Sequence, residues 1–152
     1  MTWIFWIATA IIVYAYVGYA AWLRVRSRWR AKPVERAAIT PSISIVMVVR
    51  NEGRILNAKF ENLLNLDYPA ELSEVVVVSD GSSDDTNYIL GQLGTNQRVR
   101  GIVNPEARGK AAGLNDAIAA AKGEIIVFND ARQKIEPDAV RLLVENFADA
   151  KV

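Results

Sequence analysis

A short acidic turn behind a β-branched segment has the residue types that could hold a nucleotide. Residues 80–86 read DGSSDDT and directly follow VVVVS at residues 75–79. The Asp80 carboxylate can accept hydrogen bonds from a nucleobase or a ribose, while Gly81 lets the backbone approach a ligand closely. The candidate substrate-binding residues of this turn are Asp80, Gly81 and Ser82.

Polar clusters follow two further apolar segments. Residues 43–49 read ISIVMVV and run into Asn51 and Glu52, while residues 124–128 read EIIVF and run into Asp130. If the three segments are parallel strands, their carboxyl ends and the clusters behind them gather at one edge of a sheet. Such an edge is where open α/β sheets bind ligands, so we add these three side chains to the candidate site.

A basic loop at residues 107–110 opens a helical stretch that contains Asn115. Helix N-termini favour anions, so Lys110 is poorly placed as a solvated residue. A diphosphate between Lys110 and the backbone N–H groups would explain its position better. Asn115 lies off the apolar face that we expect for this helix, so it contacts either the loops or water.

Other candidates also have structural interpretations. Asp84 could cap the next helix, which would leave residues 80–86 as a solvated turn. Asn51 could stabilise its own turn, and Glu52 could cap or solvate the helix that follows it.

Strand and helix patterns alternate along the chain, which predicts an α/β fold with a parallel, nucleotide-binding (Rossmann-like) sheet and right-handed crossovers. We expect strands over 43–49, 75–79, 98–103 and 124–128, and helices over 53–66, 86–93, 110–121 and 137–147. Pro137 suits the first helical position. The apolar stripes expected to face the core are Leu56, Phe60, Leu63 and Leu64; Ala111, Leu114, Ile118 and Ala121; and Val140, Leu143, Val144 and Phe147.

The order of these motifs closely resembles the membrane-anchored family 2 glycosyltransferases, which have the GT-A nucleotide-sugar-binding fold. The resemblance covers residues 41–152 and rests on Asn51-Glu52, DGSSDDT, Arg108-Gly109-Lys110 with Asn115, and Asp130. It implies that these positions hold UDP or another sugar nucleotide. Asp80 would read the base, Lys110 would face the diphosphate, and Asp130 would be the first carboxylate of the metal-binding D-x-D.

The chain departs from the family pattern at Arg132, which stands where the second acid of D-x-D is usual. The resemblance implies Mg²⁺ or Mn²⁺ as cofactor, but a cation cannot ligate either ion. Asp130, diphosphate oxygens and water could still hold Mg²⁺, which retains much of its water shell. Arg132 could alternatively bind phosphate itself or point to solvent.

The family's later half supplies the acceptor site and the carboxylate that activates the acceptor hydroxyl. No downstream carboxylate is well placed in this chain, because Asp138 opens a helix and Asp149 lies beyond its end. We therefore expect no catalytic base in this chain. We also expect it to contain the N-terminal, donor-binding half alone, as a fragment or a truncated product that is inactive without its missing half or a partner subunit.

Residues 3–23 carry no charged side chain, and about 20 apolar residues span a bilayer. A cleaved signal peptide would have a positive start and a shorter apolar run, so we interpret the segment as a transmembrane anchor. The predicted domains are the anchor at 1–23, a basic juxtamembrane linker at 24–40, and an incomplete GT-A-like domain at 41–152.

The basic residues that follow the anchor predict its orientation. They include Arg24, Arg26, Arg28, Arg30 and Lys32. Positive flanks remain cytoplasmic, so the N-terminus should lie outside and the globular part inside. Basic residues spread over the folded part would indicate nucleic acid, but acids outnumber bases there. The chain has no cysteine or histidine, which excludes Ser-His and Cys-His catalysis in it.

The function predicted from the sequence is that of an inverting glycosyltransferase for polysaccharide or glycolipid synthesis, of which this chain is the donor-binding part. Two alternatives remain open. One is a sugar-nucleotide-binding module without catalysis. The other is a different α/β nucleotide enzyme, such as a nucleotidyltransferase, although no Gly-rich loop supports it.

Overall fold

The protein is described by a computed structural model that covers residues 2–29 and 33–152. It divides into two compact units, Met1–Val34 and Glu35–Val152. Two of the basic residues expected to follow the anchor, Arg30 and Lys32, lie outside the described residues.

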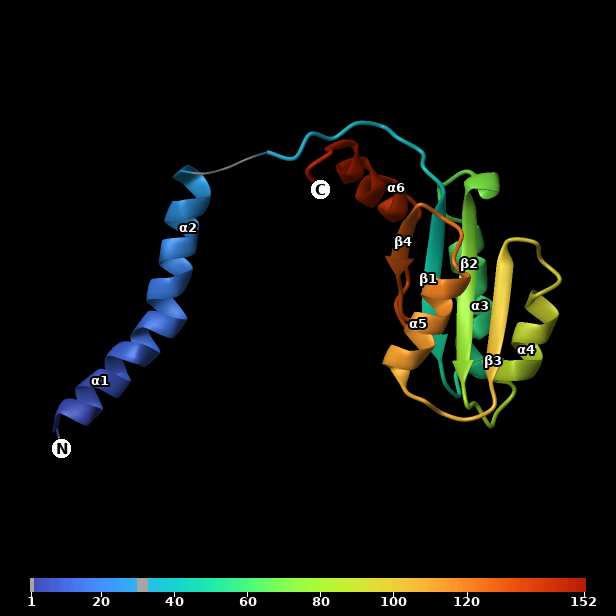
Figure 1. Ribbon diagram of the computed structural model, residues 1–152, viewed down its shortest axis with the longest axis horizontal. Helices are drawn as coiled ribbons and strands as arrows, with labels where there is room; N and C mark the ends of the chain where they lie inside the picture. The colour runs from blue at the N-terminus through green and yellow to red at the C-terminus, as the bar shows by residue number, and fades with distance from the viewer. Residues whose placement is uncertain (1, 30–32) are drawn as a thin grey trace. The chain divides into compact units, whose positions relative to one another are not determined.

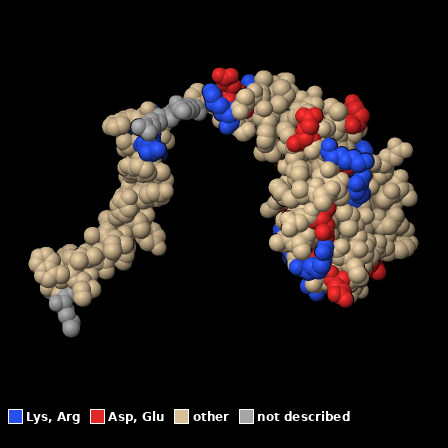
Figure 2. Space-filling view, viewed as in Figure 1, with Lys and Arg blue, Asp and Glu red and all other residues tan. Residues whose placement is uncertain are grey.

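The N-terminal unit contains one continuous helix. It consists of α1 (Thr2–Val13), the π-helical segment η1 (Tyr14–Gly18) and α2 (Tyr19–Trp29). The whole helix, Thr2–Trp29, has 28 residues and is long and apolar enough to cross a membrane. Figure 2 shows its visible face without charged side chains except near its C-terminal end. The apolar run at 3–23 thus lies within a single helix.

The second unit contains a four-stranded parallel sheet in the order β3-β2-β1-β4 (Figure 1). The strands are β1 (Ile43–Val49), β2 (Ser73–Asp80), β3 (Val99–Asn104) and β4 (Ile125–Phe128). The parallel α/β prediction is confirmed. β2 extends beyond its predicted bounds at both ends, because Ser73 and Glu74 pair with β1 and Asp80 pairs with Asn104 of β3.

Helices cover both faces of the sheet, with α5 in front and α3 behind in the view of Figure 1. The helices of this unit are α3 (Gly53–Leu64), α4 (Thr86–Leu93), α5 (Lys110–Ala120) and α6 (Ala139–Val144), with 3-10 turns η2 (Ala70–Leu72) and η3 (Glu145–Ala148). Alternate side chains of β1 enter two cores. Ile45 and Met47 pack with α3, α4 and α6, while Val46 packs with Ala117 of α5.

Two predicted helix faces were partly wrong. On α5 the buried residues are Gly113 and Ala117, while Ala111 is exposed and Ile118 is 39% exposed. A Cβ on Gly113 would lie 2.8 Å from Val48 Cγ1, so the helix approaches the sheet through its smallest residues rather than through its largest ones.

The last helix is shorter than predicted. It begins at Ala139 with Asp138 as its N-cap, so Pro137 lies outside it, and η3 replaces its last turn. Leu143 of α6 and Phe147 of η3, which we expected to be buried, are exposed by 50% and 45%. On α3, by contrast, Leu56, Phe60 and Leu63 are buried as expected, and Leu64 is partly buried.

Candidate functional site

The predicted polar clusters lie at one edge of the sheet. β1 pairs with β2 on one side and with β4 on the other, and all three run parallel. Their carboxyl ends therefore bring together the loops that begin at Arg50, Gly81 and Asn129. The loop before α5 lies at the same edge. We call the polar residues of these four loops the strand-end cluster.

Asn51 joins the loop behind β1 to the turn behind β2. Its backbone has φ 55°, a left-handed conformation that asparagine tolerates better than most residues. Its Oδ1 accepts a hydrogen bond from Ser83 N at 2.8 Å, and its own N–H donates to Ser82 Oγ at 3.1 Å. Ser82 Oγ also lies 2.8 Å from Ser79 Oγ. Asn51 and Ser82 thus fix the neighbouring loops to each other.

Asp84 makes the capping contacts expected from its structural interpretation. Its Oδ1 accepts from Thr86 N at 3.0 Å, and its Oδ2 accepts from Gly53 N at 3.1 Å. Its carboxylate therefore satisfies backbone donors at the start of both α4 and α3, where acidic groups are favourable. The Glu52 N–H donates to Thr86 Oγ1 at 3.0 Å and strengthens the same junction.

Asp80 holds the loop that precedes α5. The residue is 3% exposed, and its two carboxylate oxygens accept hydrogen bonds from Arg108 N and Gly109 N, both at 2.8 Å. The Arg108 N–H, followed by that of Gly109, holds the pKa of Asp80 below its ordinary value against the opposing effect of desolvation. The group is therefore ionised near neutral pH. A carboxylate has about four acceptor positions, so it can still accept a donor from a ligand.

Gly81 is required at the end of β2 for two reasons. Its φ is 63°, and a Cβ there would lie 2.5 Å from Ala107 N. The left-handed backbone and the close approach of residues 106–107 both exclude a side chain. We expected Gly81 to let the backbone approach a ligand closely. In the structure, the segment that approaches it closely is residues 106–107 of the same chain.

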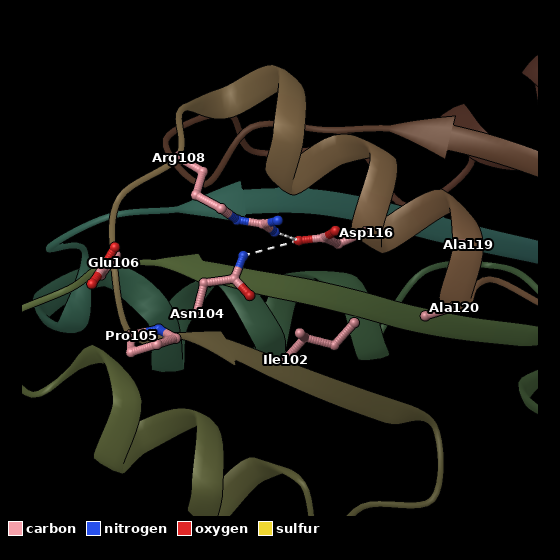
Figure 3. Close-up of a pocket in the computed structure, with 8 residues that line it drawn as sticks. All are labelled: Ile102, Asn104, Pro105, Glu106, Arg108, Asp116, Ala119 and Ala120. Carbon is pink, nitrogen blue, oxygen red and sulfur yellow. Dashed lines mark hydrogen bonds and ion pairs between the residues drawn. The ribbon is translucent and has the colours of Figure 1, made fainter.

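Asp116 is a further polar residue beside the candidate site, and sequence reasoning missed it. Its Oδ2 forms an ion pair with Arg108 Nη2 and accepts from Asn104 Nδ2 at 3.0 Å. Figure 3 shows these side chains converging beside a cavity of about 660 Å³. The only sequence signal was an acid on the helix that follows the basic loop. The neighbouring Asn115 is exposed and makes none of the hydrogen bonds that join these loops in the described chain.

A ladder of charged side chains crosses the cluster. Lys110 Nζ lies 3.2 Å from Asp130 Oδ2, and Asp130 Oδ1 accepts from Arg132 N at 3.1 Å. Arg132 Nε and Nη2 each lie 2.8 Å from Glu52 Oε1. The Arg132 N–H, and then the Lys110 ammonium, hold the pKa of Asp130 low. The hydrogen bond and charge of Glu52 raise the pKa of Arg132.

The segment behind Asp130 is fixed to α3 by two polar residues that the sequence pattern did not single out. Lys59 is 4% exposed, and its Nζ donates to Gln133 O. Asn62 exchanges hydrogen bonds of 2.8 and 2.9 Å with the backbone of Ile135. Burial lowers the pKa of Lys59, while the Asp130 charge opposes this shift. Lys59 falls within the apolar stripe of α3, which was a readable sign that it is buried.

A second cavity of about 740 Å³ opens beside Glu52 and Arg132. It contacts α3 on one side and the segment behind Asp130 on the other. Its lining includes the basic residues Arg54, Lys59, Arg132 and Lys134 and the acids Glu52 and Asp84. Four basic and two acidic side chains give this lining a formal charge of +2.

The cluster fits a divalent cation in a limited way. Among the described residues no group of three or more acidic, His or Cys side chains is arranged to hold an ion. Asp130 is the carboxylate at the end of β4, and its side chain is 42% exposed. Mg²⁺ is commonly bound through one or two carboxylates together with substrate phosphates and water. Asp130 can therefore supply one ligand, provided that phosphate oxygens supply others.

Sequence comparisons identify proteins that share this region. Residues 44–152 match the profile described as Glycosyl transferase family 2. The beta-monoglucosyldiacylglycerol synthase of Trichormus variabilis is 31% identical over 131 residues, covering 84% of this chain and 28% of that protein. The poly-beta-1,6-N-acetyl-D-glucosamine synthase of Staphylococcus epidermidis is 30% identical over 125 residues, covering 78% of this chain and 30% of that protein.

A solved structure has the same fold. The mannosyltransferase PcManGT from Pyrobaculum calidifontis, in complex with GDP-Man and Mn²⁺, matches with a TM-score of 0.81 and 29% identity. The match covers 96% of this chain and 44% of that chain. The chain thus spans less than half the length of this structure, and less than a third of the two curated relatives.

Proposed function

Because the chain belongs to glycosyl transferase family 2, we propose that it binds the nucleotide-sugar donor of a glycosyltransferase at the strand-end cluster. The observation that carries this proposal is the meeting of Asp80, Lys110 and Asp130 at one edge of a parallel sheet. The whole protein would transfer a sugar with inversion in the synthesis of a polysaccharide or glycolipid. Both product classes occur among the relatives' names.

Each part of the donor has a counterpart in the cluster. Asp80 would accept a hydrogen bond from the base with the acceptor capacity that Arg108 and Gly109 leave free. Lys110 lies at the start of α5, where backbone N–H groups and an ammonium can receive a diphosphate together. Asn51, Glu52 and Ser82 would hold the surrounding loops in place, and Asn115 would contact the donor from α5.

The proposed transfer is an in-line displacement. An acceptor hydroxyl attacks the anomeric carbon while the bond to the nucleoside diphosphate breaks, through an oxocarbenium-like transition state. A divalent cation, when bound through Asp130, would offset the charge that develops on the diphosphate. Lys110 would leave its ion pair with Asp130 and turn to the same phosphate oxygens. The side chains of Lys110 and Asp130 are both exposed to solvent, so Lys110 can exchange its carboxylate partner for a phosphate oxygen.

A non-catalytic binding module is the second candidate, and one observation favours it. Three carboxylates of the cluster are already engaged: Glu52 by Arg132, Asp80 by backbone N–H groups, and Asp130 by Lys110 and Arg132. A general base must reach the acceptor hydroxyl directly or through one water. The same loops also carry Asp84, which caps α3 and α4, and the exposed Asp85 and Glu106, to which we assign no role, so the base of the whole enzyme would come from elsewhere.

The binding test uses the full 152-residue chain in detergent. Calorimetry with UDP and with GDP, each with Mn²⁺, should detect binding of one nucleotide. The same chain with UDP- and GDP-sugars, Mg²⁺ or Mn²⁺ and membrane extract should transfer no sugar above a no-protein control. Absence of any nucleotide binding by a folded sample contradicts the proposal. Turnover that disappears in Asp130→Ala contradicts the expected lack of a base.

We also propose that the Thr2–Trp29 helix anchors the protein in a membrane, with residues 24–40 as a basic linker and 41–152 as the donor-binding domain. The arginines behind the apolar run would keep the domain in the cytoplasm, where a nucleotide sugar is accessible. The bilayer is then a partner of the chain, and other subunits could contact the same helix.

This orientation gives a topology prediction. A reporter that is active only in the cytoplasm, fused after Val152, should be active in cells. Replacing Arg24, Arg26 and Arg28 with glutamine should lower that activity, because the charge bias that sets orientation is reduced. The matched control replaces Arg54, Arg98 and Arg100 of the globular unit and should not change the orientation. High activity of an exported reporter at the same position would contradict the prediction, as would cleavage near residue 23.

A further inference from the structure

Arg132 is the member of the charged ladder with the most exposed side chain, at 76%, while its partner Glu52 is 17% exposed. We propose that Arg132 is a diphosphate-binding residue: its guanidinium, positioned by Glu52, contacts the phosphates of the donor, so that the site retains a nucleoside diphosphate without a divalent cation. This inference rests on the proposed function, because it assigns a further residue and a binding mode to the same site.

The first support is the geometry of the ion pair. Both Nε and Nη2 of Arg132 lie 2.8 Å from the same Glu52 oxygen, so one edge of the guanidinium faces the carboxylate. A guanidinium has five N–H donors in a rigid plane, and Glu52 occupies only part of them. The donors that remain match the spacing of phosphate oxygens, which arginine often binds with two hydrogen bonds.

The second support is the way in which the chain fixes this side chain. Asp130 Oδ1 accepts from Arg132 N and closes a tight turn directly behind β4. Lys59, nearly buried, holds the next residue, Gln133, through its carbonyl oxygen. The backbone of Arg132 is thus held on both sides, and its side chain is directed across to the loop behind β1. An exposed arginine that served solubility alone would not need this support.

The third support is charge. The ladder of Lys110, Asp130, Arg132 and Glu52 is neutral as a whole, with ion pairs that link its members. Where a site has an acid at the position of Arg132, a diphosphate meets an excess of negative charge, and a divalent cation offsets it. Exchanging an acid for arginine raises the local charge by about two units, which equals the charge of one such ion. With Arg132 present, a diphosphate therefore meets a neutral ladder rather than an acidic one, and it can bind there without a divalent cation to offset an excess of negative charge.

Glu52 acts in this scheme as a positioning residue. Its carboxylate is largely enclosed, and its own backbone N–H is tied to Thr86 Oγ1, so it offers a fixed acceptor. An amide oxygen at the same place could still accept from the guanidinium. The simpler explanation, in which Arg132 only neutralises the largely enclosed Glu52, predicts that loss of either charge has the same effect.

The experiment measures UDP and GDP binding to the full chain in detergent by calorimetry, with EDTA in one series and Mn²⁺ in the other. The wild type should bind one of the two nucleotides in EDTA. Arg132→Ala should weaken this binding by roughly tenfold to a hundredfold, the range expected for hydrogen bonds to a charged group. The affinity of Arg132→Lys should lie between those of the wild type and Arg132→Ala, because lysine keeps the charge and loses the planar donor set.

Three further variants separate ligand binding from a structural ion pair. Glu52→Gln should retain binding in EDTA, whereas Glu52→Ala should weaken it through loss of positioning. Arg132→Asp should abolish binding in EDTA and regain it with Mn²⁺. Lys134→Ala, which removes a cation from the same segment and the same cavity, is the matched control and should bind like the wild type.

The outcomes distinguish the inference from the proposed function. Binding of UDP or GDP by the wild type only when Mn²⁺ is present overturns the inference and leaves the proposed function intact. Unchanged binding in a folded Arg132→Ala variant, or equal losses in Arg132→Ala and Glu52→Gln, also overturns it. Failure of the folded wild type to bind either nucleotide in both series overturns the proposed function and the inference together.

Discussion

Replacing Asp80 with alanine is expected to weaken nucleotide binding by on the order of a hundredfold or more. The loss has two physical sources. The side chain is the proposed acceptor for the base, and it also holds the loop before α5 through Arg108 N and Gly109 N. Without it both backbone donors lose their acceptor, and Lys110 is no longer held at the cluster. Calorimetry with UDP and GDP measures the effect.

The isosteric variant Asp80→Asn tests the hydrogen bonds of this side chain without changing its shape. An amide presents one oxygen and one N–H₂ group, so one of the two backbone donors would face another donor. We therefore expect Asp80→Asn to lose most of the binding that Asp80→Ala loses. The control is Asp85→Ala, since Asp85 is the N-cap of α4 but makes no capping hydrogen bond with its side chain. Wild-type affinity in a folded Asp80→Ala chain would remove this residue from the site.

The lowered pKa of Asp80 predicts how the stability of the folded protein changes as the pH falls. Its pKa is lowered in the folded protein, chiefly by the Arg108 N–H, so its stabilising effect is present above the unfolded-state pKa. The effect is lost as the pH falls through the lowered pKa, below the ordinary aspartate value of about 4. Asp84 and Asp130 also have lowered pKa values and act in the same direction. Unfolding of Asp80→Ala should therefore depend less on pH than that of the wild type.

Replacing Gly81 with alanine is expected to destabilise the globular unit by about 3 kcal/mol. The new Cβ would lie 2.5 Å from Ala107 N and 2.9 Å from Glu106 C, which are backbone atoms that cannot move as a side chain can. The positive φ of 63° adds the strain of a left-handed conformation. Chemical denaturation followed by circular dichroism gives the change in unfolding free energy.

Gly91→Ala is the matched control for this substitution and should have the opposite sign. Gly91 lies within α4, and a Cβ there meets no atom within 4 Å. Alanine should stabilise the helix by about 0.5–1 kcal/mol, because it restricts the unfolded chain and favours helix. Equal effects of the two substitutions would contradict the steric explanation for Gly81.

The strands β1 and β2 could be predicted because their runs of β-branched residues favour a strand over other secondary structure. The position of α3 followed from its apolar spacing, and that of α4 from the acidic residues that could cap it. The contact face of α5 could not be predicted by choosing the largest apolar residues. There the distance between helix and sheet is set by Gly113 and Ala117, and bulkier side chains such as Ile118 remain outside the contact.

The gathering of the polar clusters at one edge of the sheet could be predicted, but the contacts between them could not. The polar residues behind three apolar segments follow parallel strands, and the carboxyl ends of these strands lie together. The partners across that edge depend on distances that a sequence does not contain. Arg132 and Glu52 are 80 positions apart, and their pairing follows from the adjacency of β1 and β4. Likewise, the Asp80 carboxylate contacts the amides of its own chain, which spacing alone did not indicate.

The strand order also has a consequence for how the protein is made. β1 lies between β2 and β4, and its first residue pairs with Ser73 on one side and with Ile125 on the other. A ribosome adds about 5–20 residues per second, so roughly 4–16 s separate the synthesis of β1 from that of β4. During this interval one edge of an apolar strand stays open on the nascent chain. Binding of a chaperone to β1 before residue 125 emerges would shield that edge from pairing with other polypeptides.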